Sequence, residues 1–113
     1  MPKRGDLECA ADIAEAIRRI EAYTEGITYQ NFLADTKTQD AVVRNLEIIG
    51  EAVKKMSGDF KAKHEDIDWK GASGMRDRLI HDYFGVNWSI VWDVTISRLP
   101  ELKSQIDQLL KSP

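Results

Sequence analysis

The chain has 113 residues, of which 42% are hydrophobic and 31% are charged, and its formal net charge at pH 7 is −3. These values are typical of one globular domain, expected to span residues 1–113, and they exclude a disordered chain. No apolar run approaches the roughly 20 residues that cross a bilayer, so a membrane partner is not expected, and the N-terminus lacks the apolar stretch of a signal peptide.

Charge and cysteine content narrow the possible functions. A net charge of −3 argues against a protein that coats nucleic acid without specificity, because such domains carry a basic surplus. It leaves open an enzyme that touches RNA through one local basic patch. The single cysteine, Cys9, excludes an internal disulfide framework and a cysteine-rich zinc site, and it favours a reduced, cytoplasmic compartment.

The first predicted element is an amphipathic helix that begins at Asp6, the expected N-cap, and ends near Gly26. Cys9 lies close to its apolar face and is expected in the core. The apolar residues that recur on this face are Leu7, Ala10, Ile13, Ile17 and Ile20.

A second helix is predicted to begin at Asp35 or Thr36, either of which can cap it, and to end near Met56. Lys54 and Lys55 fall in its last turns, where cations favour the negative end of the helix dipole. Residues 57–70 form the least regular stretch of the chain and are expected to be a polar loop.

A third long helix is predicted between Asp68 and Gly85, and Asn87 is expected to cap the helix that follows. Pro100 either kinks that helix or occupies the first turn of the last one. No β-hairpin signal is present. The sequence therefore predicts an all-α fold, an up-and-down bundle of four or five helices.

The segment GMRDRLIHDYFGV, residues 74–86, carries Arg76, His81 and Tyr83 in the pattern R-x4-H-x-Y. On a helix, Arg76 and Tyr83 share one face, but His81 lies about 140° from Arg76. The two potential catalytic side chains therefore converge poorly within one helix. They would converge better at a helix end or across a symmetric interface between two copies.

These residue types indicate one chemistry. Histidine transfers protons near neutral pH, and arginine binds phosphate oxygens with a planar fork of donors. Without a nucleophile or a metal cage, Arg76 and His81 suit attack of a substrate 2′-hydroxyl on the neighbouring phosphate, which makes RNA the substrate. The alternative is a solvated salt-bridged face that includes Asp77, Arg78 and Asp82.

Other candidate residues have simpler interpretations. The possible metal ligands lack a recognised spacing, so they are expected to be solvated or paired, and neither a metal nor a cofactor is predicted. They are His64 with Glu65, Asp66 and Asp68, and the pair Glu47 and Glu51. Trp69, Trp88 and Trp92 are expected in the core or in a dimer interface, and no glycine-rich phosphate loop occurs.

The segment MRDRLIHDYFGVNWSIVWDV closely resembles the signature of HepT-like proteins, a branch of the HEPN superfamily, and the resemblance extends from about Leu7 to Leu110. It implies a homodimeric HEPN-like helical bundle that acts as a metal-independent endoribonuclease toxin, with the cleft built from the arginines and histidines of both subunits. The implied partner is a MntA-like nucleotidyltransferase antitoxin.

Carried onto this sequence, the resemblance makes Arg76 and His81 the catalytic pair and Tyr83 the acceptor of AMP transferred by the antitoxin. The family often has asparagine after the arginine, where this chain has Asp77, which could orient Arg76 or partly neutralise it. The acidic balance and Asp77 favour an alternative, a non-catalytic HEPN module that binds a nucleotide or a partner beside an adjacent nucleotidyltransferase.

Overall fold

The computed structural model describes residues 5–80 and 85–111. At residues 75, 76 and 78–80 it describes the backbone but not the side chains. This part of the chain is helical and contains no strand, so the all-α prediction is confirmed. None of its helices combines the length and the apolarity needed to cross a bilayer. The helices are α1 (Asp6–Thr24), α2 (Tyr29–Leu33), α3 (Thr36–Lys55), α4 (Gly58–Lys63), α5 (Trp69–Ile80), α6 (Trp88–Asp93), the π-helical turn η1 (Val94–Arg98) and α7 (Leu99–Lys111).

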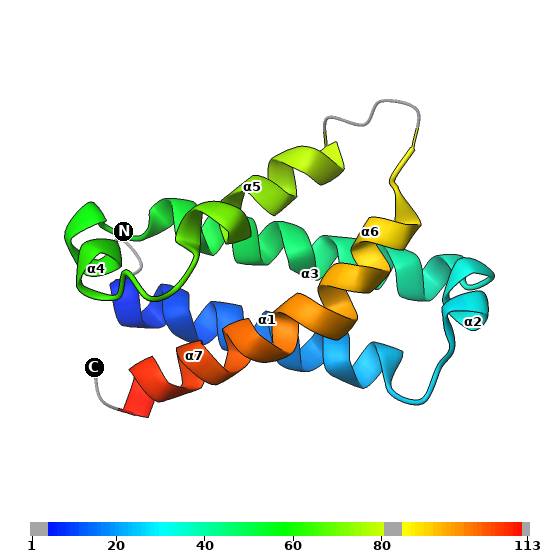
Figure 1. Cartoon of the computed structure of the whole chain (residues 1–113), viewed down its shortest axis with the longest axis horizontal. Helices are drawn as coiled ribbons and strands as arrows, with labels where there is room; N and C mark the ends of the chain where they lie inside the picture. Colours follow the sequence, from blue (N-terminus) through cyan, green and yellow to red (C-terminus); the bar gives the residue numbers. More distant parts are fainter. Residues whose placement is uncertain (1–4, 81–84, 112–113) are drawn as a thin grey trace.

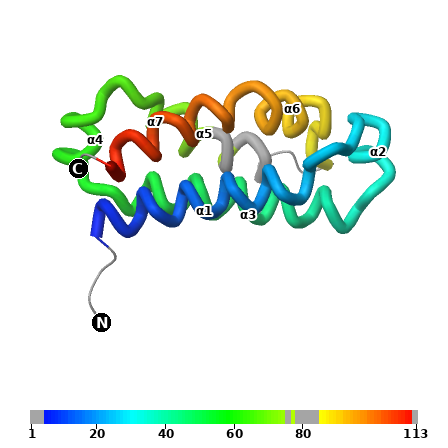
Figure 2. The backbone as a smooth tube through the Cα atoms, turned by 90° about the horizontal axis from the view of Figure 1, so that it is seen from below, coloured from blue at the N-terminus to red at the C-terminus, as the bar shows by residue number. Residues whose placement is uncertain are grey.

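The long helices run up and down in two layers. Helices α1 and α3 are antiparallel and form one layer, while α5 and the continuous α6–η1–α7 segment form the other (Figures 1 and 2). The short helices α2 and α4 lie at opposite ends of the bundle, at the connections (Figure 1). Helix α5 packs on α3 and α7 packs on α1, so the α1–α3 pair is the centre of the fold.

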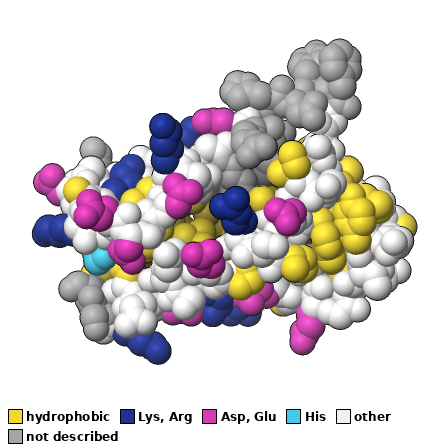
Figure 3. Space-filling model, in the orientation of Figure 1, with side chains coloured by type: hydrophobic (Ala, Val, Ile, Leu, Met, Phe, Trp, Pro, Cys, Tyr) yellow, Lys and Arg dark blue, Asp and Glu magenta, His cyan; other side chains and the backbone are white. Residues whose placement is uncertain are grey.

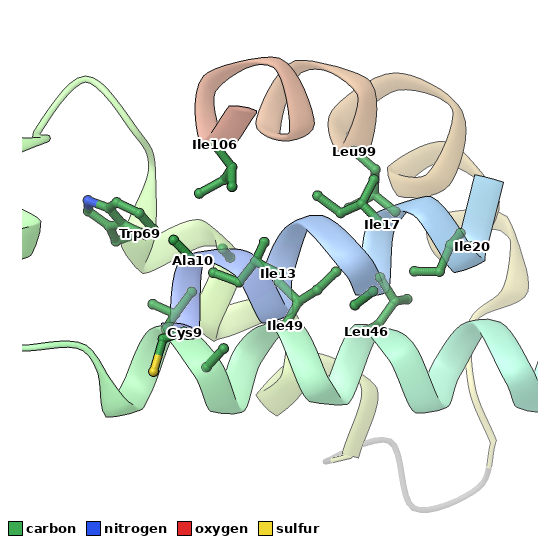
Figure 4. Close-up of a cluster of buried hydrophobic side chains, with 14 of the residues drawn as sticks. Cys9, Ala10, Ile13, Ile17, Ile20, Leu46, Ile49, Trp69, Leu99 and Ile106 are labelled. Atoms are coloured by element: carbon green, nitrogen blue, oxygen red, sulfur yellow. The ribbon is translucent and has the colours of Figure 1, made fainter. Parts of the chain in front are cut away.

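The core surrounds the apolar face of α1. Ile13, Ile17 and Ile20 have no exposed surface, and they lie between the side chains of α3 and those of α7 (Figure 4). Cys9 is 1% exposed, as the sequence predicts. The apolar residues that recur every 3.6 positions along α1 are therefore the side chains that two neighbouring helices cover.

The start of α1 differs from the prediction. Its N-cap is Gly5, and Asp6 is the first helical residue. The Asp6 carboxylate instead accepts hydrogen bonds of 2.8 Å from both the backbone N–H and the hydroxyl of Ser57, while Glu8 reaches back to the Gly5 N–H at 3.4 Å. These bonds lower the pKa of Asp6, with the backbone N–H of Ser57 as the largest cause. A long-range contact thus replaces the expected local cap.

The predicted boundaries of α3, the end of α1 and the start of α6 are confirmed, whereas the predicted end of the third long helix near Gly85 lies next to residues outside the described part of the chain. Gly26, with φ of 75°, follows the end of α1, a conformation that favours glycine. Asp35 caps α3 by accepting the Thr38 N–H at 3.1 Å, and Asn87 caps α6 by accepting the Ile90 N–H at 3.2 Å. Each of these signals acts within a few residues, so the sequence alone reveals it.

The 57–70 stretch is not entirely a loop, because it begins with α4. Ser57 caps α4 by accepting the Phe60 N–H at 3.1 Å. Helix α2 is likewise additional to the prediction; its cap is Thr28, and it buries Phe32 completely. Helices of 6 and 5 residues are too short to show a helical period in the sequence.

Pro100 occupies the first turn of α7, one of the two predicted alternatives. A π-helical turn precedes it, in which the Leu99 N–H donates to the carbonyl of Val94 five residues earlier. Within a regular helix, a proline ring clashes with the carbonyl four residues before it. The wider turn relieves this clash and lets α6 continue into α7.

Candidate functional site

The motif of residues 76–83 lies only partly within the described residues. Arg76 and Asp77 are in the second half of α5, where Arg76 is described by its backbone and Asp77 completely. His81 and Tyr83 lie outside the described residues. The structure therefore describes the helices on both sides of the motif, whereas the prediction that Arg76 and His81 lie close together in one site stays untested.

The start of α5 is held by two contacts. Asp68 accepts the Gly71 N–H at 2.9 Å, and a Cβ at position 71 would lie 2.2 Å from the Asp68 carboxylate, so a larger residue there would require this carboxylate to shift. Trp69 is 7% exposed, and its indole Nε1–H donates to the His64 carbonyl at 3.0 Å. These contacts fix the N-terminal end of the helix that carries Arg76.

Helix α6, on the other side of the motif, is held along its length by aromatic packing. The buried ring of Phe32 lies 5.8 Å from the ring of Trp88 and 5.1 Å from that of Trp92, measured between centroids. Tyr29 adds a contact of 5.9 Å to Trp92. Trp88 and Trp92 are half-buried and pack against the core, so the helices on both sides of the motif are anchored.

Asp77 forms an ion pair that the sequence analysis did not foresee. The Lys54 Nζ atom lies 3.2 Å from its Oδ1 atom, with the two side chains 46% and 48% exposed. Lys54 was assigned to the dipole of α3, and no local pattern indicates a partner 23 residues away. The pair joins α3 to α5 and places a cation on the carboxylate that adjoins Arg76.

Within the described part of the chain, the possible metal ligands do not form a metal site. No three histidine, cysteine or acidic side chains lie close enough together there to hold an ion. His64 is half-buried at the C-terminal end of α4, and its ring lies 4.8 Å from that of Phe60. Its role in this structure is packing at a helix end.

Comparison with known proteins identifies relatives of this chain over nearly its whole length. A protein-family profile described as Ribonuclease HepT-like matches residues 13–109. A Thermococcus cleftensis protein named "Probable ribonuclease HepT" is 47% identical over 109 residues, which cover 96% of this chain and 99% of the relative. A protein of Methanocaldococcus jannaschii is 43% identical over 111 residues, covering 98% of this chain and 92% of the relative. Its name gives RNase as an inferred activity. No solved structure matches the chain significantly.

Proposed function

The chain belongs to the ribonuclease HepT-like family, and from this membership we propose that it is a metal-independent endoribonuclease with Arg76 and His81 as its catalytic pair. The observation that carries the proposal is the extent of the family match, which includes the whole R-x4-H-x-Y segment together with the helices on both sides of it. The names of the relatives support the same activity.

The proposed reaction uses the substrate's own nucleophile. The 2′-hydroxyl oxygen attacks the adjacent phosphorus, the bond from phosphorus to the 5′-oxygen breaks, and the products are a 2′,3′-cyclic phosphate and a free 5′-hydroxyl. His81 transfers the proton that leaves the 2′-hydroxyl or the proton that the 5′-oxygen gains. Arg76 stabilises the additional negative charge on the pentacoordinate phosphate.

The proposed assembly is a homodimer with a shared cleft. Arg76 and His81 diverge by about 140° on a continuous helix, so a second copy offers a way to bring one subunit's arginine near the other's histidine. Mixing an Arg76→Ala chain with a His81→Ala chain tests this. Partial recovery of cleavage in the heterodimer is expected, and no recovery would favour sites that are complete within one chain.

The direct test of the activity is cleavage of RNA in the presence of EDTA, followed by analysis of the ends. We expect 2′,3′-cyclic phosphate ends, no cleavage of a substrate with 2′-deoxyribose at the cut position, and no cleavage by His81→Ala. Full activity of His81→Ala would refute the assignment of the catalytic residue. Requirement for a divalent ion would refute the mechanism.

We further propose that the protein is a cytoplasmic toxin of a type VII-like pair and that a MntA-like antitoxin inactivates it at Tyr83. The Tyr83 phenol oxygen would attack the α-phosphorus of ATP, release pyrophosphate and lose its proton. The added adenylate brings bulk and negative charge beside the phosphate-binding arginine. After co-expression with the neighbouring transferase, mass spectrometry should find one AMP on the wild type and none on Tyr83→Phe.

One observation favours a second candidate function. Asp77 follows Arg76 in the chain, and an acid at that position weakens the attraction of the site for a phosphate to the extent that its ion pair with Lys54 leaves its charge uncompensated. A non-catalytic module that binds a nucleotide or a partner beside an adjacent transferase would tolerate this. Unchanged RNA and normal growth of cells that express the protein would favour this second function.

A further inference from the structure

A groove separates α5 from the α6–η1–α7 segment. Its volume is about 600 Å³, and it opens on the face of the molecule that Figure 3 presents, where apolar side chains lie at its bottom. Leu46, Val91 and Leu99 form its closed floor and have essentially no exposed surface. Its apolar wall consists of Ile90, which keeps 36% of its surface exposed, and of the half-buried Val94 and Leu102. The second layer of the bundle is therefore open between its two helical segments, and apolar surface faces the gap.

The described polar side chains around the groove are mostly acidic. Among its described lining residues, four are carboxylates and one is a guanidinium, and all five are exposed. They are Asp66, Asp68, Asp93 and Glu101, together with Arg98.

Gly74 lines the groove from α5, and the described residues place nothing beside it that would require glycine. No described atom lies within 4 Å of the Cβ that another residue would place there. Glycine inside a helix costs about 1 kcal/mol relative to alanine, so an unobstructed glycine suggests that something outside the chain approaches the backbone closely. Gly71 differs, because a Cβ at that position would meet the Asp68 carboxylate in its present position.

We propose that this groove is a docking site for an amphipathic helix of a partner protein, with apolar side chains toward the groove and lysine or arginine along its flanks. The apolar wall provides the area that excludes water, the acidic rim complements basic flanks, and Gly74 lets the partner helix approach α5. The proposal does not rest on the proposed RNase activity.

The same charges disfavour the two other occupants. RNA presents a continuous line of phosphates, which four carboxylates repel. A second copy that docked groove to groove across a two-fold axis would bring two acidic rims together. A basic partner helix is the occupant for which both the apolar wall and the rim are favourable.

A designed peptide tests the proposal. The probe is a fluorescein-labelled helix of about 18 residues, or five turns, with leucine on one face and lysine on the other, and its matched control has glutamate in place of lysine. Fluorescence anisotropy at low salt should show the lysine peptide binding at least about tenfold more tightly than the glutamate peptide. Replacing Gly74 by leucine should weaken that binding about tenfold, because the new side chain occupies the groove.

Matched variants separate blocking from misfolding. Gly74→Ala adds one methyl group and should retain binding, and both Gly74 variants should melt no lower than wild type because they improve helix propensity. Asp93→Asn/Glu101→Gln should weaken binding of the lysine peptide. Asp40→Asn/Glu25→Gln removes the same charge from exposed positions that do not line the groove, and it should change binding much less.

Three results would overturn the proposal. The first is a lysine peptide that fails to bind or that binds Gly74→Leu as tightly as wild type. The second is a wild-type dimer in light scattering that Gly74→Leu converts to a monomer, which would make a second copy the occupant. The third is a labelled oligouridine whose binding is weakened by Gly74→Leu and strengthened by Asp93→Lys, which would make the groove an RNA path.

Discussion

Replacing Phe32 with alanine removes the side chain that ties α2 to the start of α6. Phe32 has no exposed surface, and its ring contacts both Trp88 and Trp92, at centroid distances of 5.8 and 5.1 Å. These tryptophans belong to α6, the helix that follows the R-x4-H-x-Y segment, and Trp88 is its first residue. The substitution therefore tests whether a helix of five residues, invisible to sequence periodicity, anchors one side of the candidate site.

The expected cost follows from burial and ring geometry. A buried Phe→Ala change costs about 3–5 kcal/mol, which includes about 0.5–1.5 kcal/mol for each aromatic pair that is lost. A chain of 113 residues has a total stability of roughly 6–17 kcal/mol at about 0.05–0.15 kcal/mol per residue. The variant should fold, but with a large part of its stability removed. Phe32→Leu keeps most of the apolar volume and should cost about 1–2 kcal/mol.

Urea denaturation followed by circular dichroism measures the effect. With a slope of about 2 kcal/mol per molar urea, a loss of 4 kcal/mol lowers the midpoint by about 2 M. The matched control is Leu33→Ala on the same short helix, where the side chain is 44% exposed and the expected cost is below about 1 kcal/mol. Equal midpoints for Phe32→Ala and Leu33→Ala would refute the anchoring role of Phe32.

Three further predictions concern polar contacts. Asn87→Ala should lower the free energy of unfolding by about 1 kcal/mol through loss of the α6 cap, while Asn87→Asp should retain it, in urea titrations. The lowered pKa of Asp6 contributes stability that is fully present above 3.8, the ordinary pKa of an aspartate, and is lost as pH falls through the lower folded-state pKa. Asp6→Asn should therefore flatten the acid side of the curve of unfolding free energy against pH. Lys54→Met should lower the free energy of unfolding by less than about 1 kcal/mol, because the ion pair with Asp77 is exposed. A double-mutant cycle with Asp77→Asn should show a coupling energy that disappears at high salt. A coupling energy that does not depend on salt would contradict an exposed ion pair.

Local signals account for what the sequence predicted well. The apolar period of α1 and α3, the Asp35 and Asn87 caps and the positive φ of Gly26 all depend on residues within one or two turns. Such interactions stay the same whatever the rest of the chain does. For this reason the bundle and most helix boundaries were predictable before the tertiary contacts were known.

Contacts between distant residues account for the rest. Asp6 was predicted to be a cap, but both of its carboxylate oxygens accept hydrogen bonds from Ser57, which is 51 residues away. Lys54 was assigned to its own helix, but it meets Asp77 on α5. Neither pairing has a signature in the sequence, because each depends on how α3 lies against its neighbours.

The position of Gly74 connects the two proposals through the geometry of α5. Arg76 is two residues farther along, and on a regular helix two such positions are separated by a rise of about 3 Å and a rotation of about 200°. A partner helix that docks at Gly74 would therefore press on α5 from one side, while a phosphate held by Arg76 would approach from another. Docking and RNA binding would then act on one helix without competing for one surface. Under both proposals, the lysine-flanked peptide should alter cleavage without displacing the RNA, whereas displacement would place both ligands on the same face of α5.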